Sequence, residues 1–122
     1  MSTRAIGIDF GTTKTLVAYL NPREKRPETL RLGLGTDFVP TTAAIDTKGQ
    51  LFFGNEAEDM LEDPSVAYLR GFKMELGSET PLYMLPHSDG RVKPVTAQEL
   101  VTEFLRRLRL AVQDKVFMGG EV

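Results

Sequence analysis

The chain has 122 residues, of which 41% are hydrophobic and 26% charged, a balance typical of one globular domain rather than of a disordered segment. Its formal net charge of -2 gives no general attraction to nucleic acid or to an anionic membrane. It has no cysteine, which excludes disulfides and thiolate metal sites and is compatible with the cytoplasm, and its N-terminus has the features of neither a signal peptide nor a membrane span.

The N-terminal third predicts strands. Residues 4–10 are mostly apolar, and residues 14–20 are rich in β-branched and aromatic side chains. The Gly-Thr-Thr turn at 11–13 separates them, so we expect a hairpin. A charged loop over 21–28 then leads into a third expected strand over 29–34.

The middle of the chain predicts two strands and then two short helices. The pattern places these elements at residues 41–46, 50–53, 56–62 and 65–72. Asn55 is in position to cap the first helix, whose acidic first turn suits the positive end of the helix dipole. Pro64 separates the two predicted helices.

The C-terminal third predicts a hairpin and a long helix. Apolar runs at 82–85 and 91–95 flank an Asp89-Gly90 turn. Thr96 and Glu99 then form a capping box for a helix that extends to about Lys115. Its expected apolar face consists of Leu100, Val101, Phe104, Leu105, Leu108, Ala111 and Val112.

This order of elements predicts an α/β fold with a mixed, largely antiparallel sheet in which strands precede helices. Gly119-Gly120 reads as a helix stop, and Glu121-Val122 as the start of a further strand. We therefore expect the chain to be the N-terminal piece of a larger domain.

The turn after the first strand has the composition of a phosphate-binding loop. Gly11 allows a close approach of the backbone, whose N–H groups then form an anion-binding concavity. Thr12 and Thr13 add hydroxyl donors, and Lys14 adds a cation. Asp9 would repel a phosphate unless Mg²⁺ lay between them, so we expect it to hold Mg²⁺. An ordinary hairpin with a polar turn is the simpler alternative.

Residues 6–13, with the sequence Ile-Gly-Ile-Asp-Phe-Gly-Thr-Thr, resemble the first phosphate motif of the actin-like ATPase superfamily. The continuation into 14–18 is most similar to DnaK-type chaperones, the 70-kDa heat-shock family. Residues 38–45, residues 53–57, and the segment from Ser65 to Gly77 resemble later parts of that family in the same order.

The resemblance implies a ribonuclease-H-like, two-lobed ATPase domain with ATP and Mg²⁺ in its cleft. Residues 1–34 would form the phosphate-loop sheet of the first lobe, and 35–122 its outer subdomain and long helix. Thr12 and Thr13 would contact the β- and γ-phosphates, with Gly11 and Lys14 beside them, and Asp9 would hold Mg²⁺ through water.

The resemblance also implies that Lys73 reaches the γ-phosphate as the catalytic lysine. By itself, a lysine in Gly71-Phe72-Lys73-Met74 reads as a solvated surface residue. Arg70 is its nearest rival, since a shift of three residues along a helix would exchange them.

The implied function is that of an ATP-hydrolysing cytoplasmic chaperone with client peptides and co-chaperones as partners, and with neither nucleic acid nor membrane among them. We expect this chain by itself to be inactive. An actin-like filament protein of the cell-shape type and a sugar-kinase-type phosphotransferase are the alternatives, because both share the loop.

Other polar residues have simpler explanations. His87 stands alone without a ligand set and is expected at the surface. Arg106, Arg107 and Arg109 suit the negative end of the long helix. The acidic residues between 56 and 63 are expected on an exposed helix surface.

Overall fold

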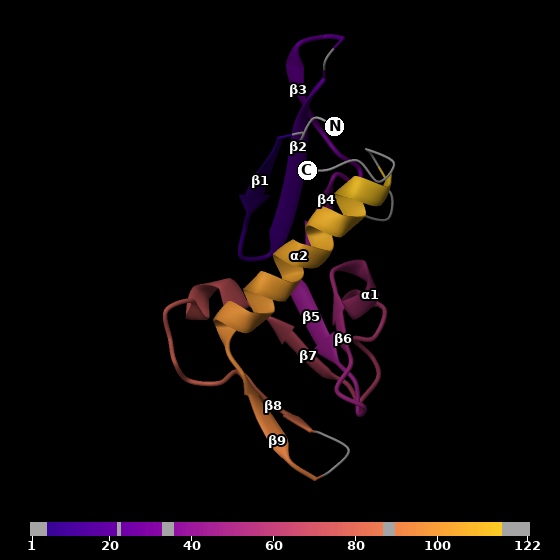
Figure 1. The fold of residues 1–122 in the computed structure, drawn as a ribbon. Coiled ribbons are helices and arrows are strands. Elements are labelled where there is room, and N and C mark those ends of the chain that lie inside the picture. Colours follow the sequence, from indigo (N-terminus) through magenta and orange to yellow (C-terminus); the bar gives the residue numbers. More distant parts are fainter. Residues whose placement is uncertain (1–4, 22, 33–35, 87–89, 116–122) are drawn as a thin grey trace.

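The computed structural model describes residues 5–21, 23–32, 36–86 and 90–115. It contains two small sheets, a separate hairpin and one long helix, α2 (Ala97–Lys115), that runs from the hairpin past both sheets (Figure 1). Every strand pairing in these ranges is antiparallel. The fold is therefore α/β as expected, whereas the parallel pairs of a mixed sheet are absent from the described residues.

The first sheet is built around β2 (Lys14–Asn21). One edge of β2 pairs with β1 (Ile6–Phe10), and the other pairs with β3 (Arg26–Thr29) and, nearer the start of β2, with β4 (Phe38–Pro40). The β1–β2 hairpin confirms the prediction made from two strand-forming runs around the Gly-Thr-Thr turn. β2 thus links the turn at its start to both sides of the sheet.

The third strand begins earlier than the sequence predicts. Residues 26–29 form β3, whereas the strand was expected over 29–34 after an irregular loop. The side chain of Asn21 accepts hydrogen bonds from the backbone N–H groups of Arg23 and Glu24, and Lys25 adopts a left-handed φ of 54°. This tight turn returns the chain immediately, so charged residues pair with β2.

The second sheet has the order β6-β5-β7, with β5 (Thr42–Ile45) at its centre. β6 (Leu51–Phe53) follows the expected turn, but β7 (Ala67–Arg70) replaces the helix predicted over 65–72. All four residues of β5 are buried, and both its edges are paired. Pairing with a fully buried strand therefore overrides the local pattern of residues 67–70.

The first helix, α1 (Asn55–Glu58), is shorter than predicted and begins one residue earlier. Gly54, with a φ of 63°, occupies the N-cap position, and Asn55 is already helical, so the predicted cap is wrong. A Cβ at Gly54 would lie 2.6 Å from Cγ1 of Val39. The close approach of β4 and the positive φ both favour glycine there.

The hairpin of β8 (Tyr83–Pro86) and β9 (Val92–Val95) confirms the second predicted hairpin. His87 and Asp89 lie outside the described residues. The backbone N–H of Glu99 donates to Oγ1 of Thr96 over 3.3 Å, which confirms Thr96 as the cap of α2.

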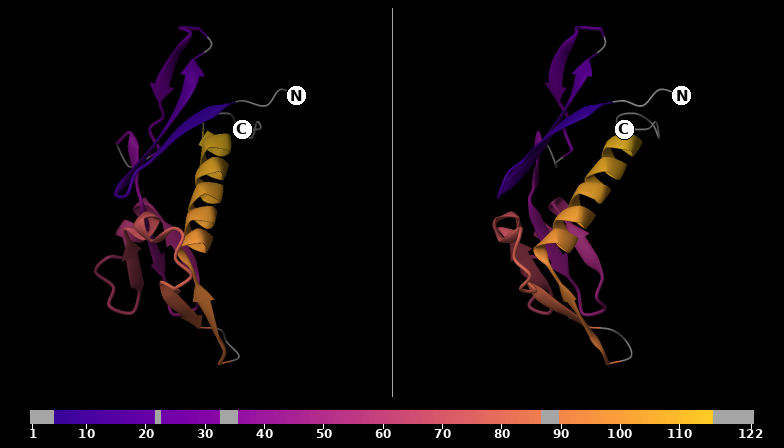
Figure 2. Two further views of the ribbon diagram at one scale, coloured as in Figure 1. Left: turned by 90° about the vertical axis from the view of Figure 1, so that its left-hand side faces the viewer. Right: turned by 60° about the vertical axis from the view of Figure 1, so that its left-hand side comes forward.

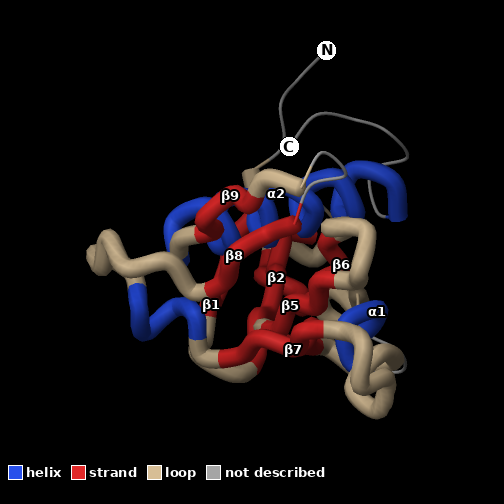
Figure 3. The backbone as a smooth tube through the Cα atoms, turned by 90° about the horizontal axis from the view of Figure 1, so that it is seen from below, coloured by secondary structure: helices blue, strands red, loops and turns tan. Residues whose placement is uncertain are grey.

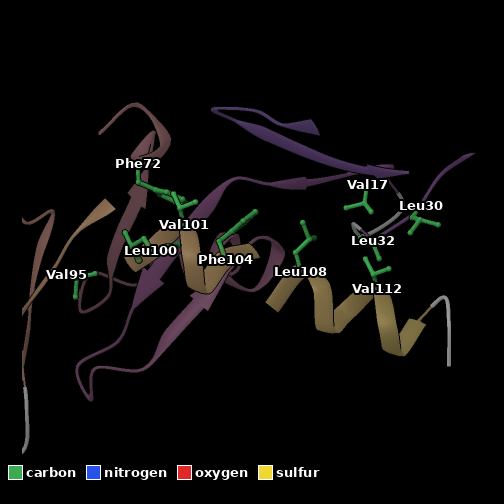
Figure 4. Close-up of a cluster of buried hydrophobic side chains, with 11 residues drawn as sticks. Val17, Leu30, Leu32, Phe72, Val95, Leu100, Val101, Phe104, Leu108 and Val112 are labelled. Atoms are coloured by element: carbon green, nitrogen blue, oxygen red, sulfur yellow. The ribbon is translucent and has the colours of Figure 1, made fainter. Parts of the chain in front are cut away.

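The apolar face of α2 supplies most of the core. Figure 2 shows the helix along one side of the strands, and Figure 3 shows the same arrangement from below. Leu100 and Phe104 lie towards Phe72, while Leu108 and Val112 lie towards Val17 of β2 (Figure 4). One helix thus covers both sheets. Within the described ranges, no helix is both long and apolar enough to cross a membrane.

A buried pair of hydroxyls connects the first sheet to the second. Oγ1 of Thr15 on β2 lies 2.8 Å from Oγ1 of Thr41, between β4 and β5, and both residues are fully buried. We expect Thr15→Val to lower the free energy of unfolding by about 1–3 kcal/mol, because it leaves one hydroxyl buried without its partner.

Urea denaturation of the two single Thr→Val variants and of the double variant checks this. The double variant should lose less stability than the two single variants added together, since it leaves neither hydroxyl unpaired. Strictly additive losses would show that the two hydroxyls do not interact.

Candidate phosphate-binding site

The turn between β1 and β2 is held tightly by its own backbone. The N–H of Gly11 donates to the carbonyl of Lys14 over 3.0 Å. A Cβ at Gly11 would lie 2.4 Å from that same carbonyl oxygen, well inside contact distance. The glycine is therefore required by the close approach of two backbone segments, and the turn has one compact shape.

The polar side chains of this turn are accessible. Asp9, Thr12, Thr13 and Lys14 are all exposed. The carbonyl of Thr13 accepts a hydrogen bond of 2.9 Å from the N–H of Thr41, so the turn is fixed to the connection between the two sheets. The hairpin end thus presents two hydroxyls on a fixed backbone, an arrangement suited to binding an anion.

Lys14 is partly held in place by an aromatic ring. Its Nζ lies 4.5 Å from the centroid of the Phe38 ring on β4, the strand that pairs with β2 beside the turn. A cation over the face of a ring is attracted to it without losing its charge. Lys14 therefore remains a positive group beside Thr13.

Lys73 reaches this turn from a distant part of the sequence. It lies in the 3-10 turn η1 (Phe72–Glu75), which Gly71 begins with a left-handed φ of 70°. Its Nζ donates a hydrogen bond of 2.5 Å to the carbonyl of Phe10, 63 residues earlier and next to Gly11. The same Nζ lies 5.3 Å from the Phe10 ring centroid.

Both partners of Lys73 are uncharged. Among the described residues no carboxylate forms an ion pair with it, although ion pairs occur elsewhere in those residues. Its half-buried ammonium is oriented by a carbonyl and a ring, and neither neutralises it. The group is therefore held next to the turn with its charge available to an anion.

Arg70, the rival of Lys73, is differently placed. It ends β7 opposite Thr42 and is exposed. Burial raises the pKa of Tyr68, and the charge of Arg70 opposes that rise, so the guanidinium lies near Tyr68. No hydrogen bond or ion pair joins Arg70 to the turn in the part of the chain that the structure describes.

Asp9 is an exposed carboxylate near the end of β1. No group of three or more His, Cys, Asp or Glu side chains suited to a metal occurs in the described ranges. The described side chains therefore supply no such ligand cluster around Asp9. Mg²⁺ bound to a nucleotide does fit, since it keeps several waters and needs only one or two carboxylates besides phosphate oxygens.

A separate hollow of about 320 Å³ lies between α2 and the strands β4 and β6. Its lining includes Leu32, Val39, Phe53, Leu108 and Ala111. Neither Lys73 nor any residue of the 11–13 turn lines it, so it is distinct from the phosphate-binding candidate.

Phe10 has a part in the site that the sequence did not reveal. In the sequence, Phe10 is only one residue of the loop motif. In the structure, its carbonyl and its ring both contact Nζ of Lys73. The ring also packs against Phe104 of α2, with centroids 5.8 Å apart. The alternation of β1 was the available signal, because it places Phe10 on the same face as Ile6, which also packs against the core.

No family model matches the chain, but curated proteins do. It is 26% identical over 117 residues to the chaperone protein DnaK of Thermosipho africanus, and 25% identical over 117 residues to that of Thermosipho melanesiensis. The chain is distantly similar to DnaK chaperones. The ribosome-associated complex subunit SSZ1 of Saccharomyces cerevisiae is 22% identical over 142 residues.

The similarity to DnaK extends far beyond the 11–13 turn. The alignments cover 96% of this chain but 18% of the length of each of the two DnaK proteins, and for SSZ1 the shares are 100% and 26%. The chain thus spans about a fifth of the length of its DnaK relatives. The family predicted from the loop and the order of later segments is supported at the level of distant similarity.

The tight turn predicts a specific effect of substitution. We expect Gly11→Ala to lower the free energy of unfolding by about 1–3 kcal/mol, because the new methyl group forces the carbonyl of Lys14 to move. Gly7→Ala in β1 is the matched control, since a Cβ there has no atom within 4 Å. It should be neutral or stabilise by up to about 1 kcal/mol.

Urea denaturation measures both effects, and amide hydrogen exchange locates them. In Gly11→Ala, hydrogen exchange of the backbone amide at position 11 should accelerate more than exchange of the other amides in the hairpin. Equal stability of the two variants would contradict the close approach in this turn.

Proposed function

We propose that this chain supplies the first phosphate-binding loop and the catalytic lysine of a DnaK-like ATPase domain. The hydrogen bond from Lys73 to the carbonyl of Phe10 carries the proposal, because it brings a cation, for which the described residues supply no carboxylate partner, to the 11–13 turn. Similarity to DnaK over 96% of the chain favours this function over a sugar kinase, which shares only the loop, and over a filament protein, for which residues 54–61 would also fit.

In this proposal the turn binds the phosphates of ATP. The backbone around Gly11 and the hydroxyls of Thr12 and Thr13 donate to the β- and γ-phosphate oxygens, and Lys14 adds positive charge beside them. Phosphoryl transfer depends mainly on positioning and on stabilising negative charge. A turn of one fixed shape meets the first of these requirements before the nucleotide arrives.

Lys73 and Asp9 meet the second requirement. Lys73 moves its hydrogen bond from the Phe10 carbonyl to the γ-phosphate and helps to place the attacking water. Asp9 accepts hydrogen bonds from waters around nucleotide-bound Mg²⁺, which neutralises charge on the phosphates when bound. The short distance from Phe10 to Gly11 along the chain makes only a small movement of the lysine necessary.

The complete activity belongs to a longer protein. By its similarity to DnaK, we propose an ATP-hydrolysing chaperone of the cytoplasm that binds client peptides and co-chaperones and neither nucleic acid nor a membrane. The domain division at residues 34 and 35 and the ribonuclease-H-like lobe belong to the same proposal.

The first test uses the chain itself. We expect Mg²⁺-ATP to shift the amide NMR signals of Gly11, Thr12, Thr13 and Lys73 together, with millimolar affinity, because the chain supplies contacts to the phosphates alone. Lys73→Gln should weaken this binding by about tenfold, the effect of losing one charge-assisted contact. Arg70→Gln, which removes a nearby exposed cation, is the matched control and should bind as the wild type does.

Two results would contradict the proposal. Amide shifts that avoid the 11–13 turn would place the nucleotide elsewhere. Equal weakening by the two substitutions would show that only the general positive charge matters.

Micromolar affinity by calorimetry would contradict a separate expectation, that this chain holds only part of the nucleotide site.

The second test uses the full-length protein of which we propose this chain to be a part. We expect Lys73→Ala to abolish ATP hydrolysis while ATP binding persists, because the lysine acts mainly on the transferred phosphate. Single-turnover hydrolysis and nucleotide binding measured on the same preparation separate the two effects. Unchanged turnover would show that another residue is the catalytic lysine.

A further inference from the structure

Three phenylalanine rings connect the phosphate turn to the segment that carries Lys73. The Phe104 ring of α2 lies 5.8 Å from the Phe10 ring and 6.2 Å from the Phe72 ring, measured between centroids. Phe10 directly precedes Gly11, and Phe72 directly precedes Lys73. One ring therefore contacts the chain neighbour of each half of the proposed site.

Phe104 is itself held firmly. It is 2% exposed, and its ring makes a third aromatic contact with Phe53 of β6, with centroids 5.9 Å apart. Figure 4 shows it on the face of α2 that points into the core. Three aromatic neighbours restrict the ring, which also borders the hollow between α2 and strands β4 and β6.

We propose that Phe104 is a positioning residue, which keeps the Lys73 ammonium against the phosphate turn. The inference rests on the proposed function in treating Lys73 and the turn as two halves of one site. Lys73 touches Phe10 through a single hydrogen bond and the face of one ring. So few contacts can hold the flexible Lys73 side chain only if the backbone at Lys73 stays at a constant distance from the backbone at Phe10.

The geometry explains how Phe104 provides that separation. η1 is a 3-10 turn of four residues in which Met74 and Glu75 are exposed and Phe72 alone is buried, and Leu76 directly after it is exposed as well. Phe72 is therefore the main anchor of the turn in the core, and Phe104 lies on the α2 face against which η1 packs. A branched aliphatic residue at 104 lacks the planar reach to contact Phe10 and Phe72 together.

The test compares Phe104→Leu with a matched core variant of the same helix. Val112 is also fully buried on α2, but it lies towards Val17 and Leu32, away from Phe72 (Figure 4). Val112→Ala therefore perturbs the core without touching the aromatic contacts. The main readout is the NMR signal of the Lys73 ε-methylene protons, which we expect the Phe10 ring to shift upfield because Nζ lies 5.3 Å from the ring centroid. Loss of the signal in Lys73→Arg identifies it.

We expect the Lys73 signal in Phe104→Leu to move to the position of solvent-exposed lysines, and the signal in Val112→Ala to stay where it is in the wild type. An unmoved signal in folded Phe104→Leu, or equal movement in both variants, would overturn the inference. Phe104→Met, whose unbranched side chain adapts to the site without supplying a ring, serves if Phe104→Leu does not fold, with the same expected result.

Titration with inorganic tripolyphosphate separates this inference from the proposed function. In the wild type, the amides of Gly11 and Lys73 should respond at the same concentration, and Phe104→Leu should weaken the response by about tenfold. No response of the wild type would overturn the proposed function, while the ε-methylene signals would still decide the positioning role. Equal tripolyphosphate affinity of the wild type and Phe104→Leu would overturn the positioning role.

Discussion

The apolar face of α2 is the constraint on which the rest of the structure depends. The first sheet is a four-stranded unit and the second a three-stranded one, and each alone has a small apolar surface to bury. α2 crosses both, with Phe104 near the second sheet and Val112 near β2. Because one rigid helix is common to both cores, the sheets hold fixed positions relative to each other, and so do the turn on one and η1 beside the other.

That fixed arrangement gives Lys73 an uncommon environment. A half-buried ammonium group usually gains stability from a carboxylate, but such a partner would also cancel its charge. Here a carbonyl and an aromatic face orient the group and leave its charge intact. Lys14 likewise lies over an aromatic ring, that of Phe38. In the proposed site, both lysines are thus oriented by uncharged groups.

The sequence predicted the elements whose patterns are local. The β1–β2 hairpin follows from two strand-forming runs around the turn at Gly11, and α2 from its apolar period and the Thr96 cap. β7 was missed because its strand conformation comes from pairing with β5, a partner more than twenty residues earlier. The early start of β3 depends on the turn that the side chain of Asn21 stabilises. The charged residues around Asn21 had predicted an irregular loop there instead.

The location of Lys73 illustrates why the site was harder to predict than the fold. Treating Arg70 and Lys73 as exchangeable assumed one helix, on which residues three apart share a face. In the structure, Arg70 ends a strand, and Gly71 turns the chain with a left-handed φ before η1 begins. The two side chains therefore belong to different elements, and burial of Phe72 in the core sets the direction of the second alone. The contact with Phe10 follows from that burial, and no pattern within residues 65–77 encodes it.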